Sequence, residues 1–504
     1  MAWKSKALWP FAKSITKRME HWIKNPVMAQ HAVFKNLLEK GAQTAFGRDN
    51  NFKAIDGYQA FNNNVPIRDY ETLRPYIDRV VAGEPDVSWP GKPLYMSKTS
   101  GTTSGIKFIP ISNESMPHHI HAVRNMLFRY FVTTGHGDFF DGKMLYLSGS
   151  PALERVNGIP TGRLSGIVNH QLPWWIKNNR LPSFRVNIEE DWEKKVDLMV
   201  EESIGRDVRL IGGIPPWIQM FYEKILDRTG KSNVRSVFPN LSVFVYGGVN
   251  FEPYKKSLES LVGGPLISLE TFPASEGFFA FQDQHPHKGL LLNVDAGIFY
   301  EFIPTEETDK QNPSRVPLED VEIGRNYALV VSTNAGLWAY NIGDTVEFTS
   351  IYPYRLRITG RTKHFISAFG EHVIGKEVET AMNCALAVHK ASIVEFSVAP
   401  QVNPPDNGLP FHEWYIEFKK PPEDIKAFAR SLDAEMVNQN IYYSDLISGN
   451  ILQSLVVRPL TKDAFRKYMQ SIGKLGGQNK VPRLTNNRQI ADDLDQFILY
   501  DQIK

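Results

Sequence analysis

Hydroxyl-bearing residues and glycines are concentrated in one short stretch, 97-SKTSGTTSGIKFIPIS-112, which ends in an apolar run. Small polar residues that bond to their own backbone, together with glycine, are typical of turns and linkers. The same residue types also suit a polyanion, because glycines let the backbone approach closely while N–H groups, hydroxyls and a lysine contact its oxygens. The stretch alone leaves both interpretations open, and residues elsewhere in the chain must decide between them.

Further motifs follow this stretch in a particular order. One apolar run ends in two glycines in 241-LSVFVYGGVNFEPY-254, and the next ends in 272-FPASEG-277. The pair 343-GD-344 lies between apolar flanks, 360-GR-361 follows it, and Lys480 lies near the end. Each motif is weak alone. Their order (Ser/Thr/Gly loop, Gly-Gly, aromatic-x-x-x-Glu, Gly-Asp, Gly-Arg and late lysine) resembles that of the adenylate-forming enzymes.

More narrowly, the chain resembles the auxin-responsive Gretchen-Hagen family of acyl acid amido synthetases, nearly from end to end. The resemblance lies in 30-QHAVFKNLLEKGAQTAFGRDNNF-52, 65-VPIRDYETLRPYI-77, 99-TSGTTSGIKFIPIS-112, 275-SEG-277, 335-AGLWAYNIGD-344 and 477-GQNKVPR-483. It implies a large N-terminal adenylate-forming domain, residues 1–360, that binds ATP and the acid, and a small mobile C-terminal domain, residues 361–504. It also implies ATP-dependent joining of a carboxylic acid to an amino acid through an acyl-adenylate, with release of pyrophosphate.

The resemblance assigns a nucleotide site. Its implied cofactor-binding residues are Ser100, Thr102, Thr103, Gly105, Lys107, Gly247, Gly248, Phe272, Ser275, Asp344 and Arg361. The hydroxyls and amides of the first stretch would bind the phosphates, so the motifs together favour phosphate binding over a simple turn. Phe272 would stack on adenine, with the two glycines leaving room for the base. Plain core packing is the alternative for this ring.

Two carboxylates have distinct expected roles. Glu276 matches the position that holds Mg²⁺ in adenylate-forming enzymes, and a hard cation of this kind binds carboxylate and phosphate oxygens. Asp344 would accept hydrogen bonds from both ribose hydroxyls. The alternatives are a solvated surface glutamate, which fits poorly between apolar runs, and a turn aspartate. We therefore expect ATP and Mg²⁺ as cofactors.

Two residues are candidates for the adenylation step itself. The small domain would bring Lys480 to the α-phosphate, and Arg361 and Lys363 begin a segment that resembles the hinge of the superfamily. The chain departs from the plant members at Asn341, where they usually have arginine, and at His372, where they often have lysine. These departures leave open whether His372 contacts phosphate or Lys480 acts alone.

The acyl pocket has a weaker signal. Its apolar candidates, near the positions where the family lines its acid pocket, are Trp174, Trp175, Ile214, Trp217 and Met220. Aromatic walls suit a hydrophobic or aryl acid, but no residue identifies the acid or the amino acid. The histidines at 118, 119 and 121 could suggest a metal site. They have no accompanying acid or cysteine cluster, so a helix is favoured there.

Composition narrows the class of protein. With 504 residues, 42% hydrophobic and 22% charged, the chain is typical of a soluble protein of two or three domains. Its 57 basic and 55 acidic residues predict neither a nucleic-acid nor a membrane partner. No apolar run approaches the roughly 18–20 residues that span a bilayer. The single cysteine, Cys384, excludes an internal disulfide, makes the cytoplasm the default and is expected to be buried in a helix. We expect a monomer that acts on small substrates.

Patterning predicts an α/β architecture. Strands are expected at 143–149, 207–214, 241–248, 265–272 and 327–333, because apolar runs of this kind form strands buried on both faces. A helix is expected at 190–205, where apolar residues recur at helical spacing. Strands that alternate with helices place ligands at the carboxyl ends of the strands.

The two ends of the chain have their own patterns. Residues 1–24 predict an amphipathic helix with Trp9, Ile15 and Trp22 on its buried side, in preference to membrane attachment. A small α+β unit is expected from about residue 360. It would contain a strand, turn and strand over 355–373, the helix around Cys384, strands at 391–400 and 411–421, and a helix from about Pro422.

Two other functions remain open. An acyl-CoA ligase of the same superfamily would share the adenylation step and use another acceptor. The near-neutral chain has no concentrated basic run beyond its N-terminal helix, which favours an amino acid over CoA. A nucleotide sensor that has lost catalysis is the second alternative. Asn341 and His372 favour it, whereas Glu276, Asp344 and Lys480 argue against it.

Overall fold

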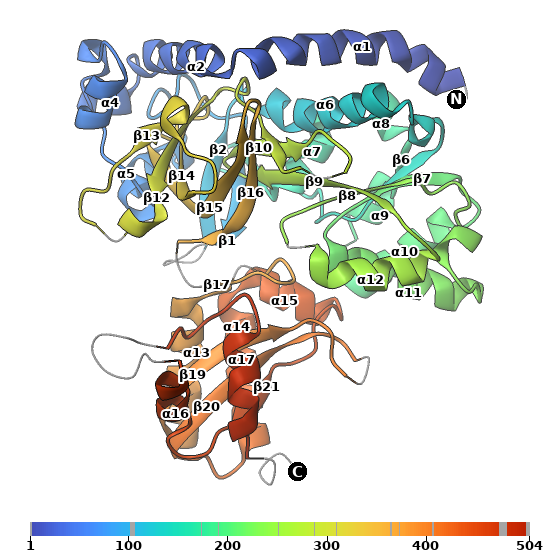
Figure 1. Cartoon of the computed structure of the whole chain (residues 1–504), viewed down its shortest axis with the longest axis vertical. Coiled ribbons are helices and arrows are strands. Elements are labelled where there is room, and N and C mark those ends of the chain that lie inside the picture. The colour runs from blue at the N-terminus through green and yellow to red at the C-terminus, as the bar shows by residue number, and fades with distance from the viewer. Residues whose placement is uncertain are drawn as a thin grey trace.

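The computed structural model describes residues 3–100, 106–172, 174–189, 191–249, 251–286, 288–308, 310–362, 365–371, 373–405, 408–472 and 481–499. The chain forms a large lobe and a small lobe, with the small lobe below the large one in Figure 1. The large lobe is a mixed α/β structure, as the sequence predicted.

The N-terminal helices lie along the top of the large lobe (Figure 1). These are α1 (Trp3–Lys24) and α2 (Pro26–Gly41), and α1 packs against α6 (Met116–Thr134). Ile15 and Trp22 of α1 are buried, and the half-buried Trp9 ring meets Phe131 edge-on with 4.8 Å between ring centres. The predicted amphipathic helix is confirmed, and its apolar side packs on protein. The shorter helices of this lobe are α3 (Ala45–Asp49), α4 (Tyr58–Asn64), α5 (Tyr70–Val81), α8 (Trp174–Lys177) and α9 (Phe184–Asn187).

A twelve-stranded sheet forms the centre of the large lobe, in the order β13-β12-β14-β15-β16-β11-β10-β9-β8-β7-β3-β6. Its parallel part consists of β9 (Ile267–Ala274), β8 (Val243–Gly247), β7 (Val208–Gly212), β3 (Lys143–Tyr146) and β6 (Arg180–Leu181). The connecting helices are α10 (Trp192–Ser203), α11 (Pro215–Thr229) and α12 (Glu252–Val262). Four predicted strands and the predicted helix at 190–205 are confirmed in this part.

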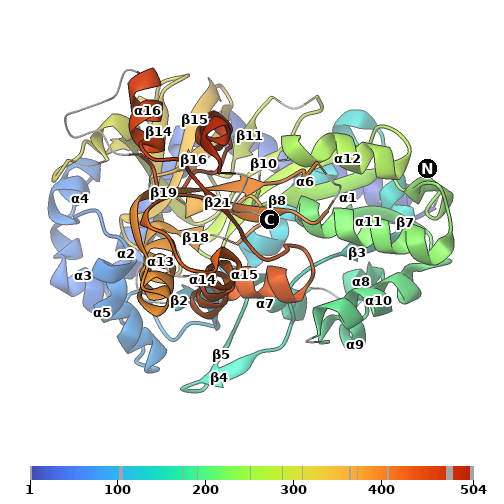
Figure 2. The ribbon, with the colours of Figure 1, turned by 90° about the horizontal axis from the view of Figure 1, so that it is seen from below.

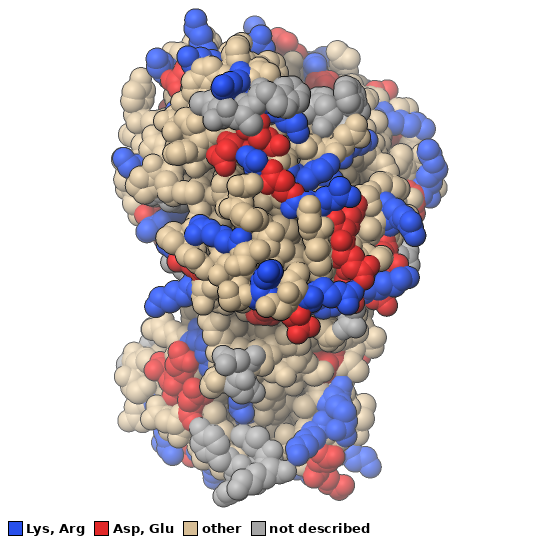
Figure 3. Space-filling model, turned by 90° about the vertical axis from the view of Figure 1, so that its right-hand side faces the viewer, with Lys and Arg blue, Asp and Glu red and all other residues tan. Residues whose placement is uncertain are grey.

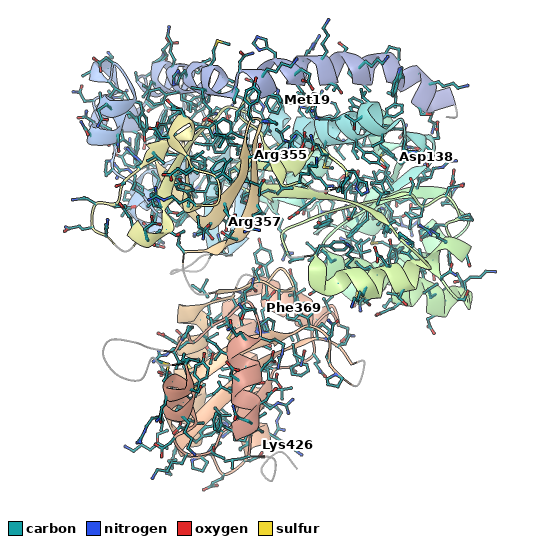
Figure 4. All side chains as sticks on the ribbon, in the orientation of Figure 1. Met19, Asp138, Arg355, Arg357, Phe369 and Lys426 are labelled. Carbon is teal, nitrogen blue, oxygen red and sulfur yellow. The ribbon has the colours of Figure 1, made fainter. Side chains whose placement is uncertain are left out.

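The other strands of this sheet pair antiparallel. They are β10 (Gly277–Gln282), β11 (Leu290–Leu292), β12 (Ile298–Pro304), β13 (Val316–Pro317), β14 (Asn326–Thr333), β15 (Tyr340–Ile351) and β16 (Tyr354–Arg361). The run at 327–333 is therefore a strand, as predicted. A buried ion pair ties β16 to the end of β10, since Arg355 Nε and Nη2 lie 2.9 and 2.8 Å from the two carboxylate oxygens of Asp283. Figure 4 labels Arg355 within this lobe.

A second, four-stranded sheet carries the hydroxyl-rich stretch. Its order is β2 (Ile106–Ile111), β1 (Tyr95–Ser100), β5 (Ile159–Gly162) and β4 (Glu154–Val156). β1 and β2 form an antiparallel hairpin in which Thr99 lies opposite Lys107. α7 (Leu164–Gln171) follows β5 directly. The stretch from 97 to 112 is thus two strands that flank residues 101–105, which lie outside the described part.

The small lobe is built on a three-stranded sheet in the order β19 (Ser392–Gln401), β20 (Phe411–Lys420) and β21 (Val456–Pro459). Its helices are α13 (Gly375–His389), α14 (Ile425–Gln439), α15 (Ile441–Ser448), α16 (Ala464–Ser471) and α17 (Gln489–Leu494), and a two-stranded pair, β17 (Phe365–Ile366) and β18 (Val373–Ile374), precedes them. The predicted α+β unit is confirmed, except that the strand at 355 is β16 of the large sheet. Figure 2 shows this lobe in front of the large one, with α15 beside α7.

One hydrophobic cluster continues from the large lobe into the small one. It joins buried residues of α11 and α12 to those of α13, α14, β19 and β20. Phe369, fully buried and labelled at the top of the small lobe in Figure 4, belongs to it. Tyr254 of α12 also donates a hydrogen bond to the carbonyl of Ala368 over 2.8 Å. The segment just after the predicted division at 360/361 is therefore packed against the large lobe.

One prediction about the small lobe is wrong. Cys384 lies on α13 as expected, but it is exposed. The buried side of α13 is formed by Val378, Ala381, Met382 and Ala385, and Cys384 falls outside that stripe. Among the described residues, no helix is both long and apolar enough to cross a membrane. On the face drawn in Figure 3, basic and acidic side chains are interspersed.

Candidate active site

The turn between β9 and β10 carries Ser275 and Glu276. Ser275 Oγ lies 2.8 Å from Ser97 Oγ of β1, so a hydrogen bond joins this turn to the hydroxyl-rich hairpin. Two motifs that are far apart in the sequence are therefore neighbours. Of the predicted phosphate-binding residues, Thr102, Thr103 and Gly105 lie outside the described part. Ser100 is described for its backbone alone.

Lys107 lies beside the same turn. Its Nζ stands 5.3 Å from the centre of the Tyr70 ring, and the Tyr70 hydroxyl accepts a hydrogen bond from the Phe108 N–H over 2.9 Å. Burial raises the pKa of both Glu276 and Asp344, and the charge of Lys107 opposes that rise in each, so Lys107 acts on both carboxylates. The structure thus brings together Lys107, Glu276 and Asp344, as the sequence predicted for a nucleotide site.

Asp344 lies opposite Arg361 on neighbouring strands. The register of β15 and β16 pairs the two residues, and Asp344 Oδ1 lies 2.8 Å from Arg361 Nε. Gly343 before it has a φ of +87°, a conformation that favours glycine. Its N–H donates to Asn341 Oδ1 over 2.9 Å. Asn341 therefore stabilises the irregular stretch of β15 that presents Asp344.

Burial raises the pKa of both site carboxylates. For Glu276, half-buried in the turn, Lys107 and Arg361 lower the pKa and Asp344 raises it further. For Asp344, the main opposing effect is Arg361, followed by Lys107. Two carboxylates and two cations therefore share a partly desolvated site, in which charge interactions are stronger than in water. Such a site suits a polyanion together with its cation.

Gly247 is the last residue of β8 and Gly248 follows it, so both glycines lie at the end of a strand, as the sequence predicted. A Cβ on Gly247 would stand 2.5 Å from the Thr271 carbonyl oxygen, so strands β8 and β9 approach too closely for any other residue. Gly248 has a φ of +84°. The ring of Phe272 is 6% exposed and meets Phe279 edge-on at 5.1 Å. The contact of Phe272 with Phe279 agrees with packing in the core, and stacking of Phe272 on adenine stays a prediction.

The candidates for the acid pocket are only partly brought together. Ile214 precedes α11, and its Cγ2 lies 3.7 Å from where a Cβ of Gly248 would stand. Trp217 and Met220 of α11 are half-buried against the cluster shared with the small lobe. Trp174 and Trp175 are the first two residues of the short helix α8, and the structure describes only their backbone. Of the three members whose side chains are described, Ile214 is the one that lies beside a nucleotide candidate, Gly248.

Residues that the sequence did not single out bring α15 of the small lobe to this site. Arg163, before α7, forms an ion pair with Asp445 and lies over the Tyr442 ring at 5.2 Å. The Tyr442 side chain is hydrogen-bonded to Thr99 and is close enough to Glu276 for that carboxylate to raise its pKa. Arg163 and Asp445 are 282 residues apart, and no local pattern marks either.

The histidine group on α6 has no metal-site geometry. Burial lowers the pKa of His118 and of His119 to about 4, so both are neutral near pH 7. No group of three His, Cys, Asp or Glu side chains that could hold a metal occurs within the described part of the chain. The predicted helix is confirmed. His372 and Lys480, the two candidates for the adenylation step, and Lys363 of the expected hinge lie outside the described residues.

Comparison with known proteins gives the same family as the nearly end-to-end resemblance of the sequence. Three family models match in sequence: the GH3 family N-terminal domain at residues 15–179, the central domain at 291–361 and the C-terminal domain at 376–489. Together they cover more than half of the chain. The protein therefore belongs to the GH3 family.

Individual relatives are distant but match over most of their length. Jasmonoyl–L-amino acid synthetase JAR4 of Nicotiana attenuata is 23% identical, over 94% of this chain and 93% of that protein. Among solved structures, the acyl acid amido synthetase AtGH3.15 in complex with 2,4-DB has a TM-score of 0.62 at 18% identity, with 97% and 96% of the two chains covered. A 2-hydroxyisobutyryl-CoA ligase has a TM-score of 0.57 at 13% identity, covering 92% and 91%. At such identities the two structures establish the fold alone, which is that of adenylate-forming enzymes.

Proposed function

We propose that this GH3 protein is an ATP-dependent acyl acid amido synthetase. A carboxylate oxygen of the acid attacks the α-phosphorus of ATP, the bond to the bridging oxygen of the β-phosphate breaks, and pyrophosphate leaves. The neutral amine of an amino acid then attacks the acyl carbonyl, AMP leaves with the bonding electron pair, and the nitrogen loses a proton. The products are an N-acyl amino acid, AMP and pyrophosphate.

The observation that carries this proposal is the meeting of Lys107, Glu276, Asp344 and Arg361 in a chain matched by all three GH3 family models. A carboxylate that attacks a phosphate needs alignment and neutralised charge more than it needs acid–base chemistry. In this proposal Asp344 binds the ribose hydroxyls, and Lys107 and residues 101–105 bind the phosphates.

The residues present fit a Mg²⁺ ion at Glu276. Its pKa is raised by burial and by Asp344, so the carboxylate gains from a nearby cation. Mg²⁺ is commonly held by one or two carboxylates together with substrate phosphates, and it keeps several waters. When bound, the ion would neutralise charge on the phosphates. Glu276 would hold it, and Lys107 and Arg361 would supply the remaining positive charge.

We also propose that the small domain, residues 361–504, rotates between the two half-reactions about a hinge at Arg361 and Lys363. Lys480 would stand at the α-phosphate during adenylation, with His372 as the alternative for this role. The single cysteine is consistent with a cytoplasmic enzyme.

The acceptor needs its own test, because the fold is shared with a CoA ligase. The protein would be incubated with ATP, Mg²⁺, mixed carboxylic acids, the common amino acids and CoA, and the products identified by mass. We expect an N-acyl amino acid. Acyl-CoA as the dominant product would assign the protein to the ligases, while ATP binding without pyrophosphate release for any acid would favour the sensor.

A further inference from the structure

Three cations gather where the chain leaves β3, at Ser148. Lys195 Nζ of α10 donates to the Ser148 carbonyl over 3.2 Å, and Arg180 Nη2 of β6 lies 3.5 Å from Ser148 Oγ. The third is Arg163, whose Nη1 lies 3.6 Å from where a Cβ of the neighbouring Gly149 would stand. We call Arg163, Arg180 and Lys195 the cationic cluster.

Lys195 is buried and Arg163 half-buried, and two carboxylates act on the three cations: Asp445 pairs with Arg163, and Glu189 raises the pKa of Lys195. Lys195 is 1% exposed, and its pKa falls to about 8 because of burial first and then of Arg163 and Arg180, with Glu189 opposing. Burial also lowers the pKa of Arg180. A buried charge is costly unless it is paired, so an anion would stabilise Arg180 in particular, whose partners among the described residues are neutral.

Arg180 has neutral neighbours within the described residues. Its Nη1 donates to Asn169 Oδ1 over 2.8 Å, its guanidinium lies 4.9 Å from the centre of the Tyr146 ring, and its buried Nε has no hydrogen-bond partner there. No carboxylate among those residues pairs with it. The guanidinium therefore has one buried N–H donor, at Nε, that the described residues leave unused and that suits an anion.

The cluster lies beside the candidate active site. β3 and β6 belong to the parallel part of the sheet, and ligands of such sheets bind at the carboxyl ends of the strands. Arg163 touches Tyr442, which in turn is hydrogen-bonded to Thr99 and close to Glu276. A ligand on the cluster would thus be a near neighbour of a group held at Glu276.

One carboxylate already binds the cluster. Asp445 of the small lobe pairs with Arg163. A carboxylate is therefore compatible with the position of Arg163, whereas the phosphates have their own candidate site at Lys107 and residues 101–105.

We infer that Arg163, Arg180 and Lys195 form the subsite that binds the α-carboxylate of the acceptor amino acid. This inference rests on the proposed function, and it deepens it by assigning the acceptor side of the reaction. A carboxylate held here orients the amine toward the acyl carbonyl, and it predicts a preference for free amino acids over amines that lack a carboxylate. Asp445 shares Arg163 in the present arrangement of the lobes and competes with the ligand for it.

The test compares amino acids with their carboxamides, which keep the amine and lose the negative charge. For the wild-type protein we expect kcat/KM to favour the free amino acid by roughly 100-fold, the size expected of charge-assisted hydrogen bonds. Arg180→Gln should raise the KM for the amino acid roughly 30-fold or more and reduce the preference to below about 5-fold. Pyrophosphate release measured without an acceptor should stay within about 3-fold.

Two further variants keep the test decisive. Arg180 is buried, so the half-buried Arg163→Gln provides a second cluster variant, and it should reduce the same preference even if Arg180→Gln misfolds. Arg185→Gln removes an exposed arginine five residues from Arg180 and should leave the preference unchanged.

The outcomes separate this inference from the proposed function. If the wild-type protein makes N-acyl amino acids and the cluster variants keep the full preference, the subsite is wrong and the function stands. A rise in the KM for ATP in place of that for the amino acid would make the cluster a phosphate site. If the wild-type protein makes no N-acyl amino acid, both fall.

Discussion

Asp344 and Arg361 face each other across β15 and β16, with 2.8 Å between Oδ1 and Nε. The ion pair engages one carboxylate oxygen of Asp344 and fixes the orientation of the group before any nucleotide arrives. A ribose that presents two hydroxyls would therefore meet a carboxylate that is already positioned.

Asp344→Ala should raise the KM for ATP by about 100-fold or more, since two charge-assisted hydrogen bonds contribute about 1.5–3 kcal/mol each. Pyrophosphate release as a function of ATP concentration measures this. Glu347→Ala is the matched control, because Glu347 lies on the same strand and pairs with Arg357 of β16 over 2.8 Å. Figure 4 labels Arg357 on that strand. An unchanged ATP dependence in Asp344→Ala would remove this residue from the ribose site.

Asn341→Ala removes the acceptor of the Gly343 N–H and should loosen the irregular stretch of β15 before Asp344. We expect the KM for ATP to rise several-fold, less than in Asp344→Ala, and the free energy of unfolding to fall by about 1 kcal/mol. Nucleotide titration and urea denaturation would measure the two effects. Asn341→Asp keeps the acceptor and should retain most of the affinity. Equal losses in both variants would contradict a role for this hydrogen bond.

Lys480→Ala should suppress adenylation far more than ATP binding, because a lysine at the α-phosphate acts mainly as charge builds up in the transition state. Single-turnover pyrophosphate release would be compared with ATP affinity measured by calorimetry. Normal pyrophosphate release in this variant would move the role to His372, and His372→Ala would then show the loss.

The buried Glu377 predicts a pH-dependent stability. Its pKa rises to about 7 because of burial, although the Ile374 N–H and the Asn440 amide, 2.9 and 3.0 Å from Oε2, both lower it. The unfolded chain ionises this group at about pH 4.3. Its contribution is therefore fully present below that pH and is lost as pH rises through about 7.

Glu377→Gln keeps an acceptor oxygen and cannot ionise. Relative to the wild type it should gain stability between pH 5 and pH 8, by up to a few kcal/mol, given about 1.4 kcal/mol for each pKa unit. Urea denaturation of both proteins at the two pH values measures this difference. A difference between the proteins that is the same at both pH values would show that Glu377 ionises normally in the fold.

Gly41 marks a position where helix α2 meets the core. A Cβ there would lie 2.6 Å from Cζ2 and Cη2 of the fully buried Trp338, so Gly41→Ala should destabilise the protein by about 1–3 kcal/mol. Gly375→Ala, at the first residue of α13, meets nothing within 4 Å and should be neutral or slightly stabilising. Thermal unfolding of both variants would test this, and equal melting temperatures would contradict the close approach.

The sequence predicted those elements whose signal is local. Apolar runs marked β3, β7, β8 and β9, because strands buried on both faces need continuous hydrophobic residues. The order of motifs identified Lys107, Glu276, Asp344 and Arg361 as a group, and the structure brings these four together.

What the sequence did not predict depends on contacts between distant segments. The ion pair of Arg163 with Asp445 and the cluster at Ser148 join separate elements, and each residue alone resembles a surface charge. The exposure of Cys384 can be predicted from the helical spacing of its neighbours. The buried side of α13 is formed by residues at helical spacing, Val378, Ala381, Met382 and Ala385, and Cys384 lies off that side. The prediction of a buried Cys384 is wrong because it rests on the residue type, and the helical period decides burial here.

The ends of the twelve-stranded sheet have a consequence for how the protein behaves at high concentration. The outermost strands, β13 (Val316–Pro317) and β6 (Arg180–Leu181), are two residues long, and each carries or precedes a proline. A sheet of this width would otherwise present long rows of unpaired N–H and C=O groups to a second molecule. Because the edge strands β13 and β6 are so short, a strand of a second molecule could form only a few hydrogen bonds with either of them. This disfavours edge-to-edge aggregation of the protein.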